Sequence, residues 1–466
     1  MEHTAPTPPS FTGPVLRPGE PGYAEEVAGF QTAAAHRPSL AVGAVDAEDV
    51  RLAVAYAAEH GLPVAVQATG HGLSVAADGG VLVGTRRMAD VEVDAPARTA
   101  RVAAGARWGA VVEAAARHGL APLNGSSPTV GAVGYTLGGG IGLLARRYGY
   151  AADHVRALEA VTADGRLRRL GPGDELFGAL LGTGGNFGVV TAVELELFPV
   201  PAVYGGQLVF DAPLAERAVE TWRRWTADGV PEEMTSSAVL LRFPDVPAVP
   251  APLRGRYTAS LRIVFAGPEE EGEKLVAPLR AAGERLVDDL RPMPYGESAA
   301  IHREPTTPHA YTATNALLRE LPPEALRAVH GTVGPDSPVD CVVDVRHLGG
   351  ALRRRGPAGA AVDHRDAEYV VRVLSFPGPR TGPDAIRERH ALLRRALEPW
   401  TAGHSLAFLY GDGERAGEAQ TRAGYEPGTY ERLAALKAVH DPHNLFRFNR
   451  NITPAAGPAG AAPATP

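Results

Sequence analysis

The stretch "VQATGHGLS" (residues 66–74) holds one histidine, His71, between two glycines, where a run predicted to be a buried strand ends. Glycine on either side lets the backbone approach a bound group closely, because no Cβ atom stands in the way. The imidazole is titratable, and its neutral form is a competent nucleophile. The stretch therefore predicts a strand followed by a glycine-rich loop, and it raises the question of why a nucleophilic ring stands between two glycines.

Outward from this loop, residues 37–200 alternate between predicted strands and helices. The run "LAVGAV" (40–45) is typical of a short strand. Asp46 then begins a helix with one apolar stripe, which ends at His60. The run "PVAVQA" (63–68) is predicted to be the next strand. This alternation predicts a first domain of mixed strands and helices.

Two more glycine-rich loops follow in the same domain, "SSPTVGAVGYTLGGGIG" (126–142) and "LLGTGGNFGVVT" (180–191). Backbone N–H groups in such loops form anion-binding nests, so the three loops together predict one site for a long ligand that carries phosphates. Ordinary turn chemistry would explain any one loop alone. Residues 140–145 also fit a dinucleotide fingerprint, but that fingerprint needs a strand directly before it, and here a glycine loop precedes it.

The middle and the end of the chain differ from the first domain. In residues 201–424, apolar runs such as "YTASLRIVFAG", "CVVDVRHLGG" and "AEYVVRVLSF" alternate with helical stretches, which predicts an antiparallel α+β domain. Residues 425–453 are predicted to be a helix followed by a turn. The Pro-rich residues 1–22 and the low-complexity residues 454–466 are predicted to be disordered.

Composition limits the classes of partner. The chain has 466 residues, a formal net charge of -7 and one cysteine, and it is 45% hydrophobic and 21% charged, as globular proteins are. Without long Lys or Arg runs and without an 18-residue apolar run, neither nucleic acid nor a membrane is expected as a partner. We expect a cytoplasmic monomer or homodimer with a small-molecule substrate and no metal site. Cys341 is expected to be a buried, inert thiol.

Four long segments resemble those of the FAD-linked oxidases of the vanillyl-alcohol oxidase superfamily, which share the PCMH-type FAD domain, and most closely its berberine-bridge-like members. In order along the chain they are "RPSLAVGAVDAEDVRLAVAYAAEHGLPVAVQATGHG", "SPTVGAVGYTLGGGIGLLARRYG", "LLGTGGNFGVVTAVELELF" and "YERLAALKAVHDPHNLFRFNRNI". The resemblance implies an α+β fold. Residues 37–200 would form a two-subdomain FAD-binding domain that 425–453 completes. Residues 201–424 would form a substrate domain, whose antiparallel sheet, flanked by helices, covers the isoalloxazine.

The resemblance also implies FAD as the cofactor, bonded covalently from His71 to the 8α-methyl carbon of the flavin. Many members add a second link from a cysteine, and here Ser127 occupies that position, so a single link is expected. The other residues expected to contact FAD lie in the three loops and near the C-terminus: Gln67, Ala68, Thr69, Gly70, Gly72, Ser127, Thr129, Val130, Gly131, Gly134, Tyr135, Gly138, Gly139, Gly140, Gly142, Gly188, Val190 and Asn449.

Family chemistry is hydride removal from a C–OH or C–N carbon to flavin N5, with O2 reoxidising the flavin to give H2O2. A base must accept the substrate proton, and the tyrosine of the family's Tyr-x-Asn motif is missing from "SLAFLYGDGE" (405–414). Tyr410 is the first candidate, since alternation along a strand would put it on the same face as Phe408. Tyr135 and Tyr311 are alternatives. The segment 363–365 is a further polar candidate, although a surface turn explains it better.

Two other classes stay open. The missing Tyr-x-Asn pair slightly favours a flavoprotein that binds or sequesters a toxic small molecule. A flavin dehydrogenase that uses a nicotinamide would need a second nucleotide fingerprint, and none is visible in the sequence. Composition and family together suggest an alcohol or amine carbon of a secondary metabolite as the site of oxidation.

Overall fold

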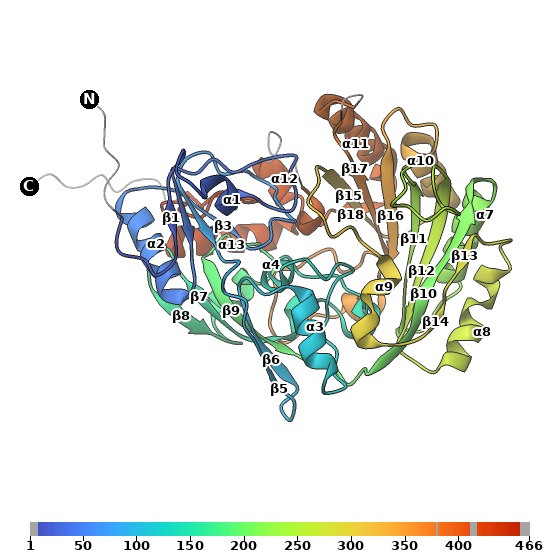
Figure 1. The fold of residues 1–466 in the computed structure, drawn as a ribbon, viewed down its shortest axis with the longest axis horizontal. Helices are drawn as coiled ribbons and strands as arrows, with labels where there is room; N and C mark the ends of the chain where they lie inside the picture. The colour runs from blue at the N-terminus through green and yellow to red at the C-terminus, as the bar shows by residue number, and fades with distance from the viewer. Residues whose placement is uncertain (1–7, 379–380, 411–416, 457–466) are drawn as a thin grey trace, which may run out of the picture.

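The computed structural model describes residues 8–378, 381–410 and 417–456, and these residues form two halves (Figure 1). One half holds a four-stranded and a five-stranded sheet, and the other holds a nine-stranded sheet. The blue N-terminal helices and the red C-terminal helix α13 lie in the same half, so segments from both ends of the chain belong to this half. The fold is α+β, as the sequence predicted.

The four-stranded sheet is mostly parallel and provides the loop that carries His71. Its strands, in the spatial order β1-β2-β4-β3, are β1 (Val15–Leu16), β2 (Leu40–Gly43), β4 (Val81–Gly84) and β3 (Val64–Gln67). The short α1 (Tyr23–Val27) precedes them, and α2 (Ala47–Glu59) packs against this sheet. Asp46 caps α2 by accepting a hydrogen bond from the Asp49 N–H, and the helix ends at His60, as predicted.

The five-stranded sheet is antiparallel and completes this half. Its strands are β5 (Val91–Asp94), β6 (Thr99–Ala103), β7 (Val155–Val161), β8 (Leu167–Leu170) and β9 (Val189–Glu196). The accompanying helices are α3 (Trp108–Ala116), α4 (Ala132–Leu137), α5 (Ala145–Tyr148) and α6 (Glu175–Leu180). Side chains of α13 (Pro427–His440), among them Tyr430 and Leu433, belong to the same apolar core as this sheet.

A buried cation fixes the C-terminal segment to the third glycine loop. Lys437 on α13 is fully buried and pairs with Asp441, four residues further along, with 2.7 Å between Nζ and Oδ2. The same Nζ donates to the carbonyl oxygens of Asn186 and Phe446. A buried charge is stable only when it is paired and hydrogen-bonded, so these contacts hold the C-terminal segment against the loop.

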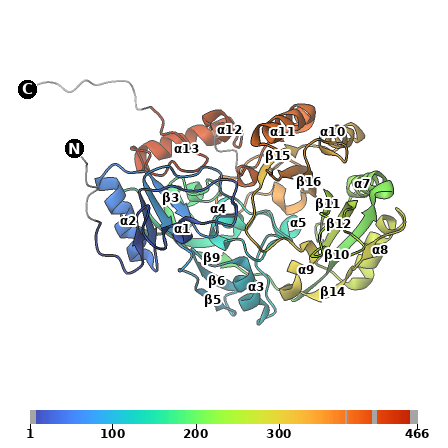
Figure 2. The ribbon, with the colours of Figure 1, turned by 45° about the horizontal axis from the view of Figure 1, so that its top comes forward.

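The nine-stranded antiparallel sheet forms the other half. Its strands are β10 (Ala202–Asp211), β11 (Met234–Arg242), β12 (Tyr257–Phe265), β13 (Val287–Asp288), β14 (Arg291–Pro294), β15 (Thr312–Leu318), β16 (Cys341–His347), β17 (Tyr369–Ser375) and β18 (Thr401–Gly403). The helices of this part of the chain are α7 (Ala212–Ala227), α8 (Glu269–Arg280), α9 (Ala299–His302), α10 (Pro323–Val333), α11 (Pro383–Leu397) and α12 (Glu418–Arg422). Of these, α7, α8, α10 and α11 cover one face (Figure 2), so the opposite face of the sheet is turned toward the first half.

Three predictions need correction. Residues 8–22 are ordered, because β1 pairs with β2; residues 1–7 and 457–466 lie outside the described residues. Phe408 ends a 3-10 turn rather than continuing a strand, so strand alternation does not relate it to Tyr410. The segment 363–365 is no surface turn, because Arg365 is 8% exposed and both of its terminal nitrogens lie 2.8 Å from Asp153 carboxylate oxygens.

Cys341 is only partly as predicted. Its side chain is half-buried rather than buried. Burial raises the pKa of its thiol, which keeps the thiol in its unreactive, protonated form.

Candidate functional site

The structure brings the three glycine loops together. The Gly131 N–H donates to Thr69 Oγ1 across 3.2 Å, which joins the first loop to the second. The Leu137 carbonyl at the end of α4 accepts from the Gly182 N–H at 2.7 Å, which joins the second loop to the third. Asn186 Nδ2 then donates to the carbonyl of Arg450 at 3.1 Å. The loops and the C-terminal segment are therefore one continuous surface.

His71 is held in place on every side. Its ring stacks on Phe30 with 3.8 Å between the centroids. Its Nδ1 lies 2.8 Å from Thr69 Oγ1, and its Nε2 lies 3.1 Å from Thr129 Oγ1. The Tyr311 hydroxyl donates to the backbone carbonyl of His71 at 2.7 Å. Both ring nitrogens thus face hydroxyl groups, which can accept from one nitrogen and donate to the other.

The surroundings of His71 keep its ring uncharged. Burial, together with the smaller effects of the positive charges of Arg107 and His309, lowers the pKa of the imidazole from its ordinary value to about 4. Above that pKa one ring nitrogen carries a free lone pair. His71 is therefore in its nucleophilic form at neutral pH.

We expect covalent attachment of FAD to the apoprotein to keep its rate between about pH 8 and about pH 5.5, and to slow as the pH falls through about 4. A histidine with the ordinary pKa of about 6.5 would instead lose half of its neutral form when the pH falls to about 6.5. The flavin retained after acid precipitation, sampled over time at each pH, measures the rate. Circular dichroism at each pH excludes unfolding as the cause, and a rate that halves near pH 6.5 would contradict the prediction.

Gly72 and Gly134, which were predicted to contact FAD, border open space, and so do Gly184 and Gly185 of the third loop, which were not predicted. At Gly72, Gly134, Gly184 and Gly185 an added Cβ would meet no protein atom within 4 Å. Asn449 donates to the Gly185 carbonyl, while its buried Oδ1 has no partner among the described residues and is free to accept from a ligand. This arrangement fits an extended cofactor that runs from His71 toward the C-terminal segment.

Other predicted glycines serve close packing instead. Gly70 has φ +72°, and a Cβ there would lie 2.6 Å from the Gly29 Cα. The missing side chains of Gly140 and Gly142 make room for the Tyr135 ring. Other predicted residues also pack against protein. A Cβ atom added at Gly139 would lie 3.1 Å from Val362, and one added at Gly138 would lie 3.0 Å from Ala407. A Cβ atom added at Gly188 would lie 2.7 Å from the Val161 carbonyl oxygen, and the Val190 side chain is buried, with 4% of it exposed.

The remaining predicted contacts lie around His71. Ser127 Oγ is 3.0 Å from Thr129 Oγ1, so a hydrogen-bonded chain runs from Ser127 to the histidine. Gln67 Nε2 donates to the Ala28 carbonyl, and its buried Oε1 has no partner among the described residues. Ala68 packs near Gly131, and the Val130 carbonyl accepts from the first N–H of α3.

The three candidate tyrosines have different surroundings. Tyr410 is 9% exposed, its ring meets Tyr311 edge-on at 5.8 Å, and its hydroxyl makes no hydrogen bond within the described part of the chain. Burial raises the pKa of Tyr311, whose hydroxyl is occupied by the His71 carbonyl. Burial also raises the pKa of Tyr135, whose ring meets Trp108 edge-on at 5.3 Å. Tyr410 and Tyr311 thus lie beside the histidine loop, and Tyr135 lies beneath the second glycine loop.

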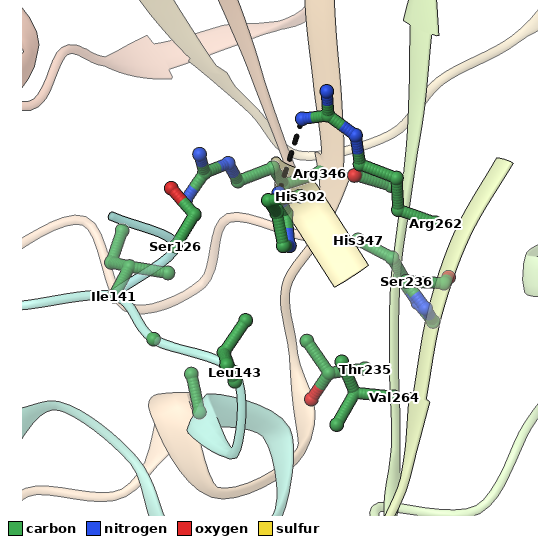
Figure 3. Close-up of a pocket in the computed structure, with 13 residues that line it drawn as sticks. Ser126, Ile141, Leu143, Thr235, Ser236, Arg262, Val264, His302, Arg346 and His347 are labelled. Atoms are coloured by element: carbon green, nitrogen blue, oxygen red, sulfur yellow. Dashed lines mark hydrogen bonds between the residues drawn. The ribbon is translucent and has the colours of Figure 1, made fainter. Parts of the chain in front are cut away.

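A group of arginines on the nine-stranded sheet was missed by sequence reasoning. Arg262, Arg346 and Arg372 come from β12, β16 and β17, and Asp344 lies between them. Figure 3 shows the Arg346 side chain reaching from the sheet toward Ser126 of the second glycine loop. Arg262 and Arg372 are each the single charged residue of their strands, and this single charge in a strand is the signal that could have found them.

Two family models match the chain. One described as an FAD binding domain matches residues 38–171, and one described as berberine and berberine like matches residues 418–453. The chain is 30% identical over 464 residues to (R)-6-hydroxynicotine oxidase of Paenarthrobacter nicotinovorans. The match covers 96% of this chain and 98% of that protein. A FAD-linked oxidoreductase of Dictyostelium discoideum is 26% identical over 463 residues, covering 96% and 95%.

Solved structures agree with these matches. 6-Hydroxy-D-nicotine oxidase from Arthrobacter nicotinovorans superposes with a TM-score of 0.80 at 26% identity, covering 96% of this chain and 99% of that one. A chitooligosaccharide oxidase superposes with a TM-score of 0.81 at 21% identity, covering 95% and 98%, which is a likeness of fold alone. Among the helices of the described residues, none has the length and apolar character that crossing a membrane requires.

Proposed function

Because the chain belongs to the berberine-bridge-like FAD-linked oxidoreductases, we propose that it is an oxidase for an alcohol or amine carbon of a small secondary metabolite. FAD held by the three glycine loops and the C-terminal segment would supply N5 as the hydride acceptor, and O2 with two protons would take up the two electrons as H2O2. The observation that carries the proposal is the uncharged His71, held between two hydroxyl groups beside open space that fits FAD.

His71 binds FAD through a single covalent bond in this proposal. The ring already faces the open loop, and the stacked Phe30 restricts its rotation. Ser127 offers a hydroxyl, which is a far weaker nucleophile than a cysteine thiolate, and Thr129 already occupies it. The relatives named nicotine oxidases have an amine-bearing compound in their names, which supports a C–N carbon as one candidate for oxidation.

Tyr410 accepts the substrate proton in this proposal. Its hydroxyl has no partner within the described residues, so it can bond to a substrate O–H or N–H. The Arg372 guanidinium lies 5.7 Å from the centre of the Tyr410 ring, on the side of the nine-stranded sheet. Tyr311 and Tyr135 remain the alternatives.

The proposal is tested with the purified flavoprotein in air-saturated buffer and a panel of alcohols and amines. We expect H2O2 to form with the productive substrates, and the flavin to bleach when the same substrates are added without oxygen. Bleaching by NADPH alone would instead support the nicotinamide-using dehydrogenase. Tight binding of a compound without bleaching or H2O2 would support a sequestering flavoprotein.

A further inference from the structure

We propose that the substrate carries a carboxylate, and that Arg262, Arg346 and Arg372 bind it on the face of the nine-stranded sheet that is turned toward the cofactor loops. This inference rests on the proposed function, since it assumes that the substrate lies between that sheet and the flavin. It names the chemical class of the substrate, which the comparisons leave open.

The three arginines lie on one face of the sheet. Leu261 and Ile263, which flank Arg262 on β12, belong to the core under the helices, so alternation along the strand turns Arg262 to the opposite face. On β16, Val345 next to Arg346 belongs to the same core, and on β17 so do Val371 and Val373, so Arg346 and Arg372 also point to the opposite face. Strand pairing also sets them near one another. Ser237 on β11 pairs with Arg262 on one side and with Arg346 on the other, and Arg372 pairs with Asp344, two residues before Arg346.

The arginines are buried with too little negative charge around them. Their side chains are 13%, 12% and 14% exposed, in chain order. Asp344 is 4% exposed and accepts from Arg346 Nε at 2.7 Å, while Arg372 Nη1 is 3.7 Å from the same Oδ2 atom. Glu304, 3.6 Å from Arg262, is the other carboxylate in reach. Three guanidinium groups therefore face two carboxylates.

The neighbouring histidine does not alter this balance. Arg262 Nη1 lies 3.1 Å from His302 Nδ1 and donates to it, as the dashed line in Figure 3 marks. Burial and the nearby arginines hold the pKa of His302 well below its ordinary value, so the ring stays neutral. A buried positive charge without a partner is costly, and an anionic ligand would remove that cost.

The hydrogen-bond donors of the arginines are also largely unused. Within the described residues the Arg372 guanidinium makes no hydrogen bond, and Arg346 makes only the one to Asp344. The Nε atoms of Arg262 and Arg372 are buried without a partner, and so is the Ser237 hydroxyl beside them. A carboxylate accepts paired hydrogen bonds from guanidinium groups, which matches these free donors.

A cavity marks where the carboxylate would lie. It has a volume of about 30 Å³ and is enclosed by Ser126 and Gly142 on the loop side and by Arg262, Ser237 and Arg346 on the sheet side. A cavity of this volume admits about two water-sized groups, so it holds one small group rather than a whole substrate. Arg372 does not line this cavity, and it would contact the carboxylate from the side of Tyr410, whose ring lies 5.7 Å from its guanidinium.

The test titrates the oxidised, flavin-loaded protein with benzoate and with its neutral analogue benzamide, followed by the change in flavin absorbance. We expect benzoate to bind at least about tenfold more tightly than benzamide, since the charged ligand meets three guanidinium groups that share only two carboxylates. Arg372→Met should weaken benzoate binding at least about tenfold while leaving benzamide unchanged. This variant is chosen because Asp344 keeps Arg346 as its partner, so the fold is expected to survive.

Arg319→Met is the matched control. Arg319 lies just past the end of β15, is exposed and pairs with Asp366 at 3.3 Å, so its loss should leave benzoate binding unchanged. Equal binding of benzoate and benzamide would overturn the inference. So would unaltered benzoate binding in Arg372→Met, or inorganic phosphate displacing benzoate at equal concentration.

A second measurement separates this role from an effect on the flavin itself. Sulfite adds to oxidised flavin more tightly when positive charge lies near the ring. If Arg372→Met weakens the sulfite adduct but not benzoate binding, the arginines serve the flavin and the inference fails. Carboxylate binding without H2O2 from any carboxylate-bearing alcohol or amine would keep the anion site and reject the proposed oxidase. If only neutral substrates give H2O2 and benzoate does not bind, the proposed oxidase is kept and the anion site is rejected.

Discussion

The His71→Ala protein is expected to release all of its flavin on acid precipitation, while the wild-type precipitate stays yellow. The physical reason is that the proposal assigns the bond to His71, whose ring is uncharged and is fixed by Phe30 and by the hydroxyls of Thr69 and Thr129. Alanine removes both ring nitrogens and changes little else, because the loop backbone is held separately by Phe30 and Gln31 N–H groups. Absorbance of the pellet and the supernatant near the flavin maximum measures the outcome.

Ser127→Ala is the matched control for the covalent link. It removes a hydroxyl from the same hydrogen-bonded chain but no nucleophile of comparable strength, so its precipitate should stay yellow. Flavin retained by His71→Ala, or a second flavin-bearing peptide found by mass mapping, would reject the single bond through His71.

Tyr410→Phe is expected to keep its flavin and the flavin spectrum, and to slow flavin reduction by a substrate about 10²-fold or more, the usual scale for losing a general base. The change removes only a hydroxyl that has no partner among the described residues, so the packing against Tyr311 stays. Rapid mixing of the oxidised protein with substrate in the absence of oxygen, followed at the flavin band, measures the reduction rate.

Tyr311→Phe serves as the comparison. The Tyr311 hydroxyl donates to the His71 carbonyl, and burial raises the pKa of that hydroxyl. Tyr311→Phe should therefore remove a hydrogen bond that positions the histidine loop, and it should leave the rate of flavin reduction largely unchanged. A wild-type reduction rate in Tyr410→Phe, with a slow Tyr311→Phe or Tyr135→Phe, would move the base to that residue. Wild-type rates in all three would show that no tyrosine hydroxyl takes part in the slow step.

Local patterns in the sequence were enough to predict the fold class and the elements near His71. The helix from Asp46 to His60 follows from a capping side chain and an apolar stripe, and both act between residues only a few positions apart. The apolar runs of the middle segment likewise predicted an antiparallel sheet with helices, because strand and helix periodicity are properties of a short window. His71 was found because two glycines mark it in the sequence.

Features that depend on neighbours distant in the chain could not be predicted. Residues 8–22 lack a strong local pattern, yet β1 is ordered because β2 offers it an unpaired edge. Arg365 sits in a polar segment typical of a surface turn, but it is buried in an ion pair with Asp153, which lies 212 positions earlier in the chain. Burial of a polar group is decided by what packs on it, and its own sequence window does not contain that information.

The sequence alone therefore determined which residues can form strands, helices and close glycine loops, because those preferences arise from steric and capping effects between near neighbours. The tertiary structure decided which of the side chains meet. Strand register sets Arg346 and Arg372, from β16 and β17, around the Asp344 carboxylate. Packing of the same kind encloses His71 and lowers its pKa, because the energy of a charge depends on the atoms around it in space rather than on its neighbours along the chain.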